Sequence, residues 1–334
     1  MVCVRVEFAM QQKDEVSETF REIYFAGGCF WGVEELMRSV QGVVDAVSGY
    51  ANGRSGPAPS YEEVCSGKTG FSETVRVVYD PARVSLSGLV FLFFRAIDPT
   101  DSGGQGNDRG TQYRSGIYYS EEESAVVIRR AADVERRRHS AFYVEILPLL
   151  NFYPAEEFHQ RYLEKHEGGY CHIPRELFSN AGSMRVDPQR YPRPSDAEIS
   201  RRLSSQEFSV TQEGATDLPH SHPLTTEVRR GLYVDAVTGE PLFSSRDKYQ
   251  SSCGWPAFSE PVDGNTMVFS EDRSHGMRRS EVRSRTGDSH LGHVFGGDEE
   301  SPSGVRFCIN GSSLRFVPYE RMEEEGYGEL MDLV

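Results

Sequence analysis

Alternating polar and apolar positions in the first half of the chain predict strands and helices that follow one another. Strand-like stretches lie at 22–26, 43–50, 73–80, 112–119 and 142–149. Apolar residues at helical spacing predict helices at 33–40, 86–97, 121–138 and 154–166, the last with a proline in its first turn. We therefore expect an α+β domain over residues 20–180, a two-layer α/β sandwich with a mixed sheet.

The pattern changes after residue 180. Three closely spaced prolines, Pro188, Pro192 and Pro194, predict a linker over 181–199 that leads into a short helix at 195–203. Short strand-like stretches with turn signals follow at 231–237, 241–244, 266–270, 280–284, 290–295, 305–309 and 313–317. They favour a mainly β domain over 200–322, with antiparallel sheets arranged as in a β-sandwich. Residues 1–19 are assigned to an N-terminal arm and 323–334 to an acidic tail.

Residues 27–32 (GGCFWG) place a thiol, two large aromatic rings and three glycines where a predicted strand passes into a predicted helix. The N–H groups and dipole of a helix start favour thiolate over thiol, so Cys29 occupies a position suited to a nucleophile. Phe30 and Trp31 offer an apolar wall for a small uncharged group such as a methyl. The plainer interpretation is a buried cysteine with two core aromatics at a glycine-rich turn.

The other polar residues of this half bear on what Cys29 could attack. A cysteine hydrolase would need a paired base, and the histidines lie far from Cys29 in the sequence, at His139, His159, His166 and His172. The loops instead supply a carboxyl from Glu73 and phenols from Tyr61 and Tyr113. These groups are hydrogen-bond donors able to hold and protonate an oxygen atom.

Composition narrows the classes of partner and compartment. The formal charge of −15 over 334 residues, without a cluster of Lys and Arg among aromatics, argues against nucleic acid and anionic membranes as partners. The N-terminus lacks the apolar core of a signal peptide, and the apolar run at 86–97 is too short to cross a bilayer. A cytoplasmic location is expected. The six cysteines form no C-x-x-C pair, so we expect reactive or inert thiols instead of a structural disulfide framework.

Four segments in order, GGCFWG, GYANGRSGPAPSYEEVCSG, GFSE and GNDRGTQYRSGIYY, resemble the A-type methionine sulfoxide reductases, across residues 20–178. The resemblance implies that Cys29 attacks the sulfoxide sulfur while Phe30 and Trp31 seat the methyl group. It also implies that Glu73 binds and protonates the sulfoxide oxygen. Tyr61 and Tyr113 would help, and Asp108 would support the site. A neutral Glu73 suits this role, because the oxygen leaves only when protonated.

A second thiol must condense with the sulfenic acid that forms on the attacking cysteine. The resemblance implies that this resolving thiol is Cys171, in the segment GYCHI that commonly holds the recycling cysteine of the family. Cys65 is the competing candidate.

Three segments of the second half resemble the B-type methionine sulfoxide reductases, over residues 200–320: SCGWPAF, SHLGHVF and RFCINGSSLRF. By this resemblance Cys308 is the nucleophile, Arg306 stabilises its thiolate and Cys253 is the resolving thiol. The same resemblance implies that Trp255 forms the wall against the substrate methyl group. The residues on the side of the sulfoxide oxygen would be His290, His293 and Asn310. A pair of histidines with this spacing also occurs in metal sites, but no third ligand is evident.

Many B-type relatives hold zinc with two C-x-x-C pairs, and this chain lacks them. The matching positions are Asp235, Thr238, Ser284 and Gly287. These residues cannot form the tetrahedral thiolate site that zinc prefers, so no metal is expected.

The two resemblances together imply a bifunctional reductase that converts methionine sulfoxide, free or in oxidised proteins or peptides, to methionine as a repair under oxidative stress. The first domain would act on the S-epimer and the second on the R-epimer. Each nucleophile would pass through a sulfenic acid and an intramolecular disulfide, Cys29 with Cys171 and Cys308 with Cys253. Thioredoxin or a similar dithiol would be the electron donor. Two alternatives stay open: a thiol peroxidase or cysteine hydrolase in the first domain, and a sulfoxide-binding scaffold with a degenerate second domain.

Overall fold

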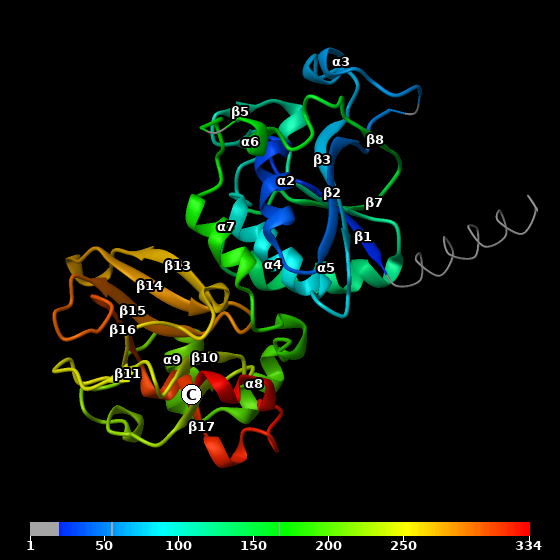
Figure 1. The fold of residues 1–334 in the computed structure, drawn as a ribbon. Helices are drawn as coiled ribbons and strands as arrows, with labels where there is room; N and C mark the ends of the chain where they lie inside the picture. The colour runs from blue at the N-terminus through cyan, green and yellow to red at the C-terminus, as the bar shows by residue number, and fades with distance from the viewer. Residues whose placement is uncertain (1–19, 55, 167) are drawn as a thin grey trace, which may run out of the picture. The chain divides into compact units, whose positions relative to one another are not determined.

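The computed structural model describes residues 20–54, 56–166 and 168–334. The chain divides into two compact units, Met1–Ser183 and Met184–Val334. The predicted N-terminal arm, with Cys3, lies outside the described residues. Figure 1 shows the elements of both units, each of which is described below by itself.

The first unit contains a six-stranded sheet in the order β7-β6-β1-β3-β2-β8. Its strands are β1 (Arg21–Ala26), β2 (Val43–Ala51), β3 (Ser72–Tyr79), β6 (Gly116–Tyr119), β7 (Glu145–Pro148) and β8 (Phe152–Pro154). β6 and β7 are parallel, whereas all other neighbours are antiparallel. The mixed sheet predicted for this domain is confirmed.

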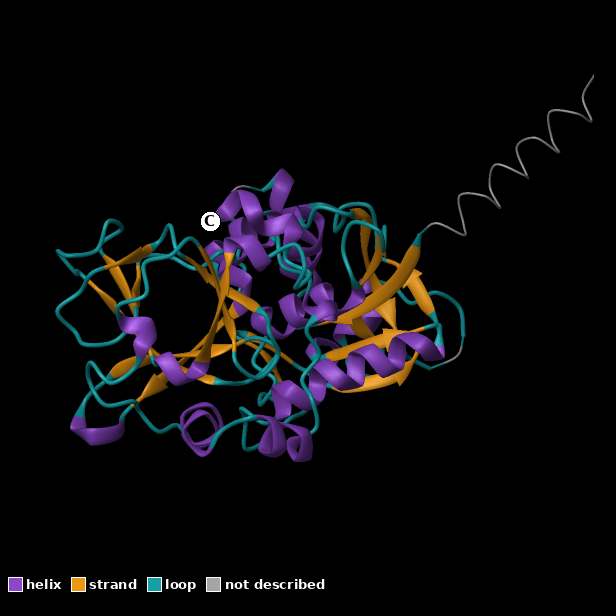
Figure 2. Cartoon of the chain, turned by 90° about the horizontal axis from the view of Figure 1, so that it is seen from below, coloured by secondary structure: helices purple, strands orange, loops and turns teal. Residues whose placement is uncertain are grey.

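Helices pack on this sheet, as Figure 2 shows by colour. They are α2 (Phe30–Ser39), α3 (Tyr61–Cys65), α4 (Leu86–Ala96), α5 (Glu122–Arg136), α6 (Tyr162–Lys165) and α7 (Arg175–Gly182). α4 is apolar around most of its circumference because it is buried, and Phe93 stacks on Phe25 of β1 with ring centroids 4.9 Å apart. A small hairpin of β4 (Gly104–Gln105) and β5 (Asp108–Arg109) precedes a 3-10 turn, η1 (Thr111–Tyr113).

The helix predicted over 154–166 is wrong for most of its length. Pro154 ends β8, where it pairs with Gly49 of β2, and a helix forms only at Tyr162–Lys165. The side chain of Gln160 acts as a strand partner: its amide accepts from Ser48 N at 3.0 Å and donates to Ser48 O at 2.9 Å. Arg161 has a φ of 52°, which interrupts a helix. Tertiary hydrogen bonds therefore override the helical pattern of this segment.

The second unit contains two antiparallel sheets with the orders β10-β9-β17 and β11-β12-β16-β15-β14-β13. Their strands are β9 (Gly231–Asp235), β10 (Pro241–Ser244), β11 (Lys248–Tyr249), β12 (Ala257–Phe258), β13 (Met267–Asp272), β14 (Arg279–Ser284), β15 (His290–Gly296), β16 (Val305–Ile309) and β17 (Leu314–Pro318). Tyr233 and Phe243 of the smaller sheet pack with Phe258, Val282 and other residues of the larger one in a single core. The prediction of a mainly β second domain is confirmed.

Two helices precede these sheets, α8 (Asp196–Arg202) and α9 (Ser205–Glu213). The first was predicted and the second was not. Both begin with a capping box, in which the serine hydroxyl accepts from the third helical residue and the glutamate there accepts from the serine N–H. The serines are Ser195 and Ser204.

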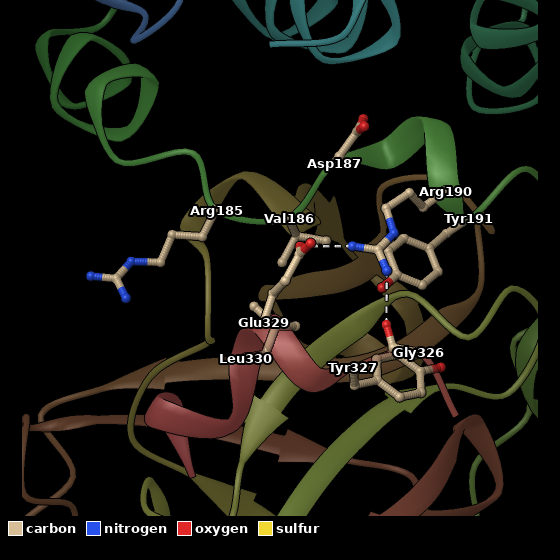
Figure 3. Close-up of a pocket in the computed structure, with 9 residues that line it drawn as sticks. All are labelled: Arg185, Val186, Asp187, Arg190, Tyr191, Gly326, Tyr327, Glu329 and Leu330. Carbon is tan, nitrogen blue, oxygen red and sulfur yellow. Dashed lines mark hydrogen bonds and ion pairs between the residues drawn. The ribbon is translucent and has the colours of Figure 1, made fainter. Parts of the chain in front are cut away.

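The segments assigned to a linker and an acidic tail form part of the second core. Tyr327, Leu330 and Val334 are buried in a cluster that includes Val186 and Tyr191. Figure 3 shows the small pocket that these two segments line, bridged by the side chain of Arg190. Arg190 donates to Glu329 Oε2 at 2.9 Å and to Gly326 O at 2.8 Å. Apolar burial thus joins the beginning and the end of this unit.

A buried carboxylate ties β9 to β14 and to the turn before β15. Asp235 accepts four hydrogen bonds: from Val237 N at 3.1 Å, Thr238 Oγ1 at 2.9 Å, Ser284 Oγ at 3.0 Å and Ser289 Oγ at 2.8 Å. A Cβ atom at Gly287 would lie 2.1 Å from Asp235 Oδ2, so glycine is required there. Burial raises the pKa of Asp235, and the four donors oppose this effect.

We expect Asp235→Asn to destabilise the second unit by about 1–3 kcal/mol, because its amide group would face donors that need an acceptor. The measurement is urea unfolding followed by Trp255 fluorescence, with Trp31 replaced by Phe in all variants. Asp332→Asn, at an exposed position, is the control and should change the free energy of unfolding by less than about 0.5 kcal/mol. Equal unfolding midpoints for the two variants would contradict the role of Asp235.

Candidate active sites

Cys29 lies between β1 and α2, as the sequence predicts. It is the N-cap of α2 and is buried. Gly28 before it has a φ of 77°, and a Cβ atom there would lie 2.6 Å from the Cβ of Gln105. The turn that presents the sulfur therefore depends on a glycine.

The expectation that this position favours a thiolate is not met. Burial raises the pKa of the Cys29 thiol above its ordinary value, and the carboxyl of Glu73 raises it further. A backbone hydrogen bond from Trp31 lowers the pKa, as expected for a helix start, but it does not offset these effects. Cys29 is a thiol in the resting site.

Glu73 lies on β3 and is 1% exposed. Its Oε2 accepts a hydrogen bond from the backbone N–H of Phe30 at 3.1 Å. Burial raises the pKa of Glu73 to about 8, although the Phe30 N–H acts in the opposite direction. The carboxyl is therefore largely neutral at pH 7, and it is held by the residue next to Cys29.

The structure gathers Tyr61, Tyr113 and Asp108 around Glu73. Burial and the nearby Glu73 carboxyl raise the pKa of both tyrosines, so both phenols keep their protons. Burial also raises the pKa of Asp108, whose Oδ2 is buried without a hydrogen-bond partner among the described residues. Asp108 in turn raises the pKa of Cys29 and of Glu73. The predicted oxygen-binding groups thus share one site with Cys29.

The predicted apolar wall has support that the sequence analysis missed. Phe30 is buried, and the rings of Phe30 and Trp31 lie 6.4 Å apart. Trp31 stacks on Tyr162 with a centroid distance of 3.7 Å and an interplanar angle of 10°. It also donates its indole N–H to His159 Nδ1 at 3.2 Å. The sequence could have indicated this support through the aromatic side chains within residues 158–162, which lie in the helix predicted over 154–166.

The two candidate resolving thiols lie in different surroundings. A Cβ atom at Gly32, in the first turn of α2, would lie 2.8 Å from the Sγ of Cys171. The sulfur of Cys171 therefore packs against the helix that Cys29 caps, and the two thiols interact electrostatically. Cys65 is exposed at the end of α3. The geometry favours Cys171.

In the second unit Cys308 lies on β16, paired with Ala257 of β12 on one side and His293 of β15 on the other. Its Sγ lies 3.5 Å from the Sγ of Cys253, to which it donates. This contact lowers the pKa of Cys253 to about 5 and raises that of Cys308, so the pair shares one proton.

Arg306 lies beside this thiol pair. It forms an ion pair with Asp298 at 2.5 Å, and its guanidinium lies over the ring of Phe295 at 5.1 Å. Its charge lowers the pKa of both cysteines. The predicted stabilisation of a thiolate by Arg306 therefore applies to either sulfur atom.

Each of the two predicted histidines is held by a carboxylate that the sequence analysis did not single out. His290 Nδ1 lies 2.6 Å from Glu281 Oε1, and His293 Nε2 lies 2.8 Å from Asp272 Oδ2. The two imidazole rings are 5.7 Å apart. Glu281 lies on β14, the strand next to β15, and Asp272 lies on β13, the edge strand beyond it. No sequence motif links these carboxylates to the histidines.

Trp255 and Asn310 are joined through a third missed residue, Asp217. The indole N–H of Trp255 donates to Asp217 O at 2.9 Å, and Asp217 N donates to Asn310 Oδ1 at 2.9 Å. The Asp217 carboxylate accepts from Ser312 N at 2.8 Å. One buried residue therefore fixes both the predicted methyl wall and a group of the predicted oxygen side.

Comparison with protein families decides the identity. A model described as peptide methionine sulfoxide reductase matches residues 21–189, just over half of the chain, and one described as SelR domain matches residues 203–318. The chain belongs to the peptide methionine sulfoxide reductase family. It is a fusion of an A-type and a B-type reductase, which act on the S-epimer and the R-epimer of methionine sulfoxide respectively. The resemblance stated from the sequence motifs is confirmed.

Solved structures similar to this bifunctional reductase include reduced Mxr1 from Saccharomyces cerevisiae. That protein is 38% identical, with 46% of this chain and 90% of that chain covered and a TM-score of 0.44. Methionine sulfoxide reductase A of Corynebacterium diphtheriae is 37% identical, with 47% and 84% covered and a TM-score of 0.42. Mxr1 in complex with Trx2 is 25% identical, with 47% and 88% covered and a TM-score of 0.32.

The residues at the positions of the family's zinc ligands do not suit zinc. Thr238 and Ser284 donate to the carboxylate of Asp235, and Gly287 offers no side chain. Oxygen atoms already engaged in hydrogen bonds replace the thiolates that zinc prefers. Across residues 20–54, 56–166 and 168–334, no cluster of three or more His, Cys, Asp or Glu side chains is arranged to hold a metal ion.

Two further features bear on the reductase. Within the described residues, no helix is both long and apolar enough to span a membrane. The pocket of Figure 3 contains none of the predicted site residues, so it is separate from the candidate active site of the second unit.

Proposed function

We propose that Cys29 and Cys308 are the nucleophiles of two independent sulfoxide reductase sites. The observation that carries the proposal is the hydrogen bond between Phe30 N and Glu73 Oε2, at 3.1 Å. It holds a neutral carboxylic acid beside a thiol and an aromatic wall. This combination supplies the proton, the electron pair and the methyl contact that sulfoxide reduction needs.

In the first site Glu73 donates its proton to the sulfoxide oxygen, with Tyr61 and Tyr113 as further donors and Asp108 supporting the site. Sγ of Cys29 attacks the sulfur, and the thiol proton passes to the Glu73 carboxylate. The products are methionine and a sulfenic acid on Cys29. The thiol of Cys171 then displaces this hydroxyl group as water, which forms a disulfide.

In the second site Cys308 attacks when the shared proton is on Cys253. The two sulfur atoms are 3.5 Å apart, and Arg306 stabilises the negative charge on either one. His290, His293 and Asn310 would bind and protonate the oxygen, and Trp255 would contact the methyl group. Cys253 then condenses with the sulfenic acid of Cys308 and releases water.

Both disulfides need a dithiol to return them to thiols, and we infer that thioredoxin or a similar protein supplies it. The substrates are oxidised proteins or peptides, because the A-type and B-type families act on peptide-bound methionine sulfoxide. We assign the two activities to residues 20–180 and 200–322, with Val186 and Tyr191 of the segment between them packed in the core of the second unit. The scattered cysteines favour a reducing, cytoplasmic compartment.

We expect Cys29→Ser to lower S-epimer reduction by roughly 10³-fold or more while R-epimer reduction is unchanged, and Cys308→Ser to do the reverse. The measurement is chiral separation of a racemic oxidised methionine peptide after incubation with enzyme and a small dithiol. Cys65→Ser is the control and should affect neither rate. Loss of both activities in either single variant would contradict two independent sites.

The pKa of Glu73 predicts a pH limit for the first site. A carboxyl with a raised pKa of about 8 is protonated below that pH, so S-epimer reduction should be present at pH 7 and decline above pH 8. Glu73→Gln keeps a hydrogen-bond donor but cannot transfer a proton, and should reduce this rate by roughly 10²–10⁴-fold. R-epimer reduction in the same samples is the internal control. A Glu73→Gln enzyme with wild-type S-epimer activity would refute the acid role.

The identity of the resolving thiols is tested by disulfide mapping after one turnover without reductant. We expect Cys29 joined to Cys171, which packs against the helix that Cys29 caps, and Cys253 joined to Cys308, whose sulfur atoms are 3.5 Å apart. In Cys171→Ser, mass spectrometry should instead find Cys29 with one added oxygen. A disulfide between Cys29 and Cys65 in the wild-type protein would overturn this assignment.

A further inference from the structure

His159 is the buried centre of an aromatic cluster in the first site. The residue is 1% exposed. Its ring centroid lies 4.5 Å from that of Tyr61, 5.0 Å from that of Phe30 and 5.8 Å from that of Trp31. The imidazole therefore contacts both the apolar wall and one of the phenols near the oxygen-binding acid.

The hydrogen bond from Trp31 defines the protonation of this imidazole. An indole N–H can only donate, so Nδ1 of His159, 3.2 Å away, must carry a lone pair. Burial lowers the pKa of His159, although the carboxylate of Glu156 opposes this effect. The ring is neutral at pH 7, with its proton on Nε2. That atom is buried without a hydrogen-bond partner among the described residues, so the bond to Trp31 is what orients the ring.

The segment that carries His159 is fixed to neighbouring elements on both sides. Before it, the carboxylate of Glu156 accepts hydrogen bonds from the Tyr50 hydroxyl at 2.8 Å and from the Tyr61 N–H at 2.9 Å. After it, the side-chain amide of Gln160 bonds to the backbone of Ser48. The backbone N–H of Arg161 donates to the buried carboxylate of Glu34 at 2.9 Å. His159 is therefore a rigid anchor.

Trp31 needs such an anchor because its other support acts in a different direction. Tyr162 stacks flat on the indole at 3.7 Å, which fixes the plane of the ring. Stacking leaves the indole free to slide and turn within that plane, since its energy depends weakly on the in-plane orientation. A hydrogen bond at the ring edge removes this freedom.

We propose that His159 is a positioning residue for sulfoxide reduction by the first site, holding Trp31 through Nδ1 so that the indole face meets the methyl group of the substrate. This inference rests on the proposed role of Trp31 as the methyl wall. It adds a residue outside the oxygen-binding set, and it assigns the neutral Nε2–H tautomer to the working enzyme. His159 itself takes no part in proton transfer to the sulfoxide.

The kinetic test compares two substitutions in the full chain. His159→Phe keeps an aromatic ring but removes the acceptor, whereas His159→Asn can place its amide oxygen close to the position of Nδ1. We expect His159→Phe to raise KM for the S-epimer about tenfold with a smaller change in kcat, as for a lost hydrogen bond that orients a binding surface. His159→Asn should restore KM to within about threefold of wild type on the same scale.

A spectroscopic readout follows Trp31 directly. The indole N–H proton of Trp31, assigned in a ¹⁵N–¹H spectrum by comparison with Trp31→Phe, should move upfield in His159→Phe and stay near its wild-type position in His159→Asn. His166→Phe is the matched control, because this imidazole packs on Tyr162 at 4.4 Å. It should leave KM and the Trp31 signal unchanged. The R-epimer rate of each variant confirms equal amounts of enzyme, and the remaining signals of the ¹⁵N–¹H spectrum confirm that the first unit is folded.

The outcomes separate this inference from the proposed function. If Trp31→Phe raises KM but His159→Phe does not, the methyl wall stands and the role of His159 is wrong. If Trp31→Phe leaves KM unchanged, the proposed wall itself fails, whatever the His159 variants do. Equal losses in His159→Phe and His159→Asn would show that the imidazole only fills space, which also overturns the inference. If His159→Phe does not fold, the His159→Asn variant alone decides. A wild-type Trp31 signal and KM in that variant support the inference, and their loss overturns it.

Discussion

The first active site depends on the hydrogen bond from the Phe30 N–H to the Glu73 carboxyl. The first N–H groups of a helix have no partner within the helix, so the start of α2 needs an acceptor. Glu73 supplies it from β3, and the bond fixes the acid one residue from Cys29. A single donor lowers the pKa of the carboxyl too little to offset its burial, so the acid stays neutral at pH 7. The same contact therefore caps the helix and poises the proton.

The two sites of the chain prepare their thiols in different ways. In the first, both the thiol of Cys29 and the carboxyl of Glu73 are buried and protonated, so charge develops only when substrate is present. In the second, Cys253 and Cys308 share one proton beside the cation Arg306, so a thiolate exists before substrate binds. The proton for the sulfoxide oxygen must then come from groups other than a buried carboxylic acid, and we propose the two carboxylate-bound histidines for that role.

Local patterns in the sequence were enough for most of the fold. The helices at Leu86–Ala96 and Glu122–Arg136 and the strands around Cys29 follow directly from apolar spacing. Strands of two residues, such as Ala257–Phe258, are too short to show alternation, and their pairing depends on distant partners. The helix predicted over 154–166 failed because Gln160 and Arg161 make hydrogen bonds to β2 and α2, which are far away in the sequence.

The same distinction holds for the candidate sites. Motifs could place Cys29, Glu73 and Cys308, because each lies in a short distinctive segment. They could not reveal His159, Glu281 or Asp217, which act through residues far away in the sequence. Nor could sequence motifs show that the Cys29 thiol is protonated in the resting site. A helix start alone would lower its pKa, and only the folded structure shows that burial and Glu73 outweigh the helix.

Buried polar groups have different roles in the two units. Glu73 and His159 in the first unit are each about 1% exposed, and burial keeps both uncharged at pH 7, a state that water would not favour for the carboxyl of Glu73. Such burial opposes folding, so it must be offset by apolar packing elsewhere, as in the stacking of Phe93 on Phe25. Asp235 in the second unit differs, because four donors surround its carboxylate and link β9 to β14. The hydrogen bonds of Asp235 hold parts of the second unit together, whereas the burial of Glu73 gives the neutral acid that the proposed mechanism needs.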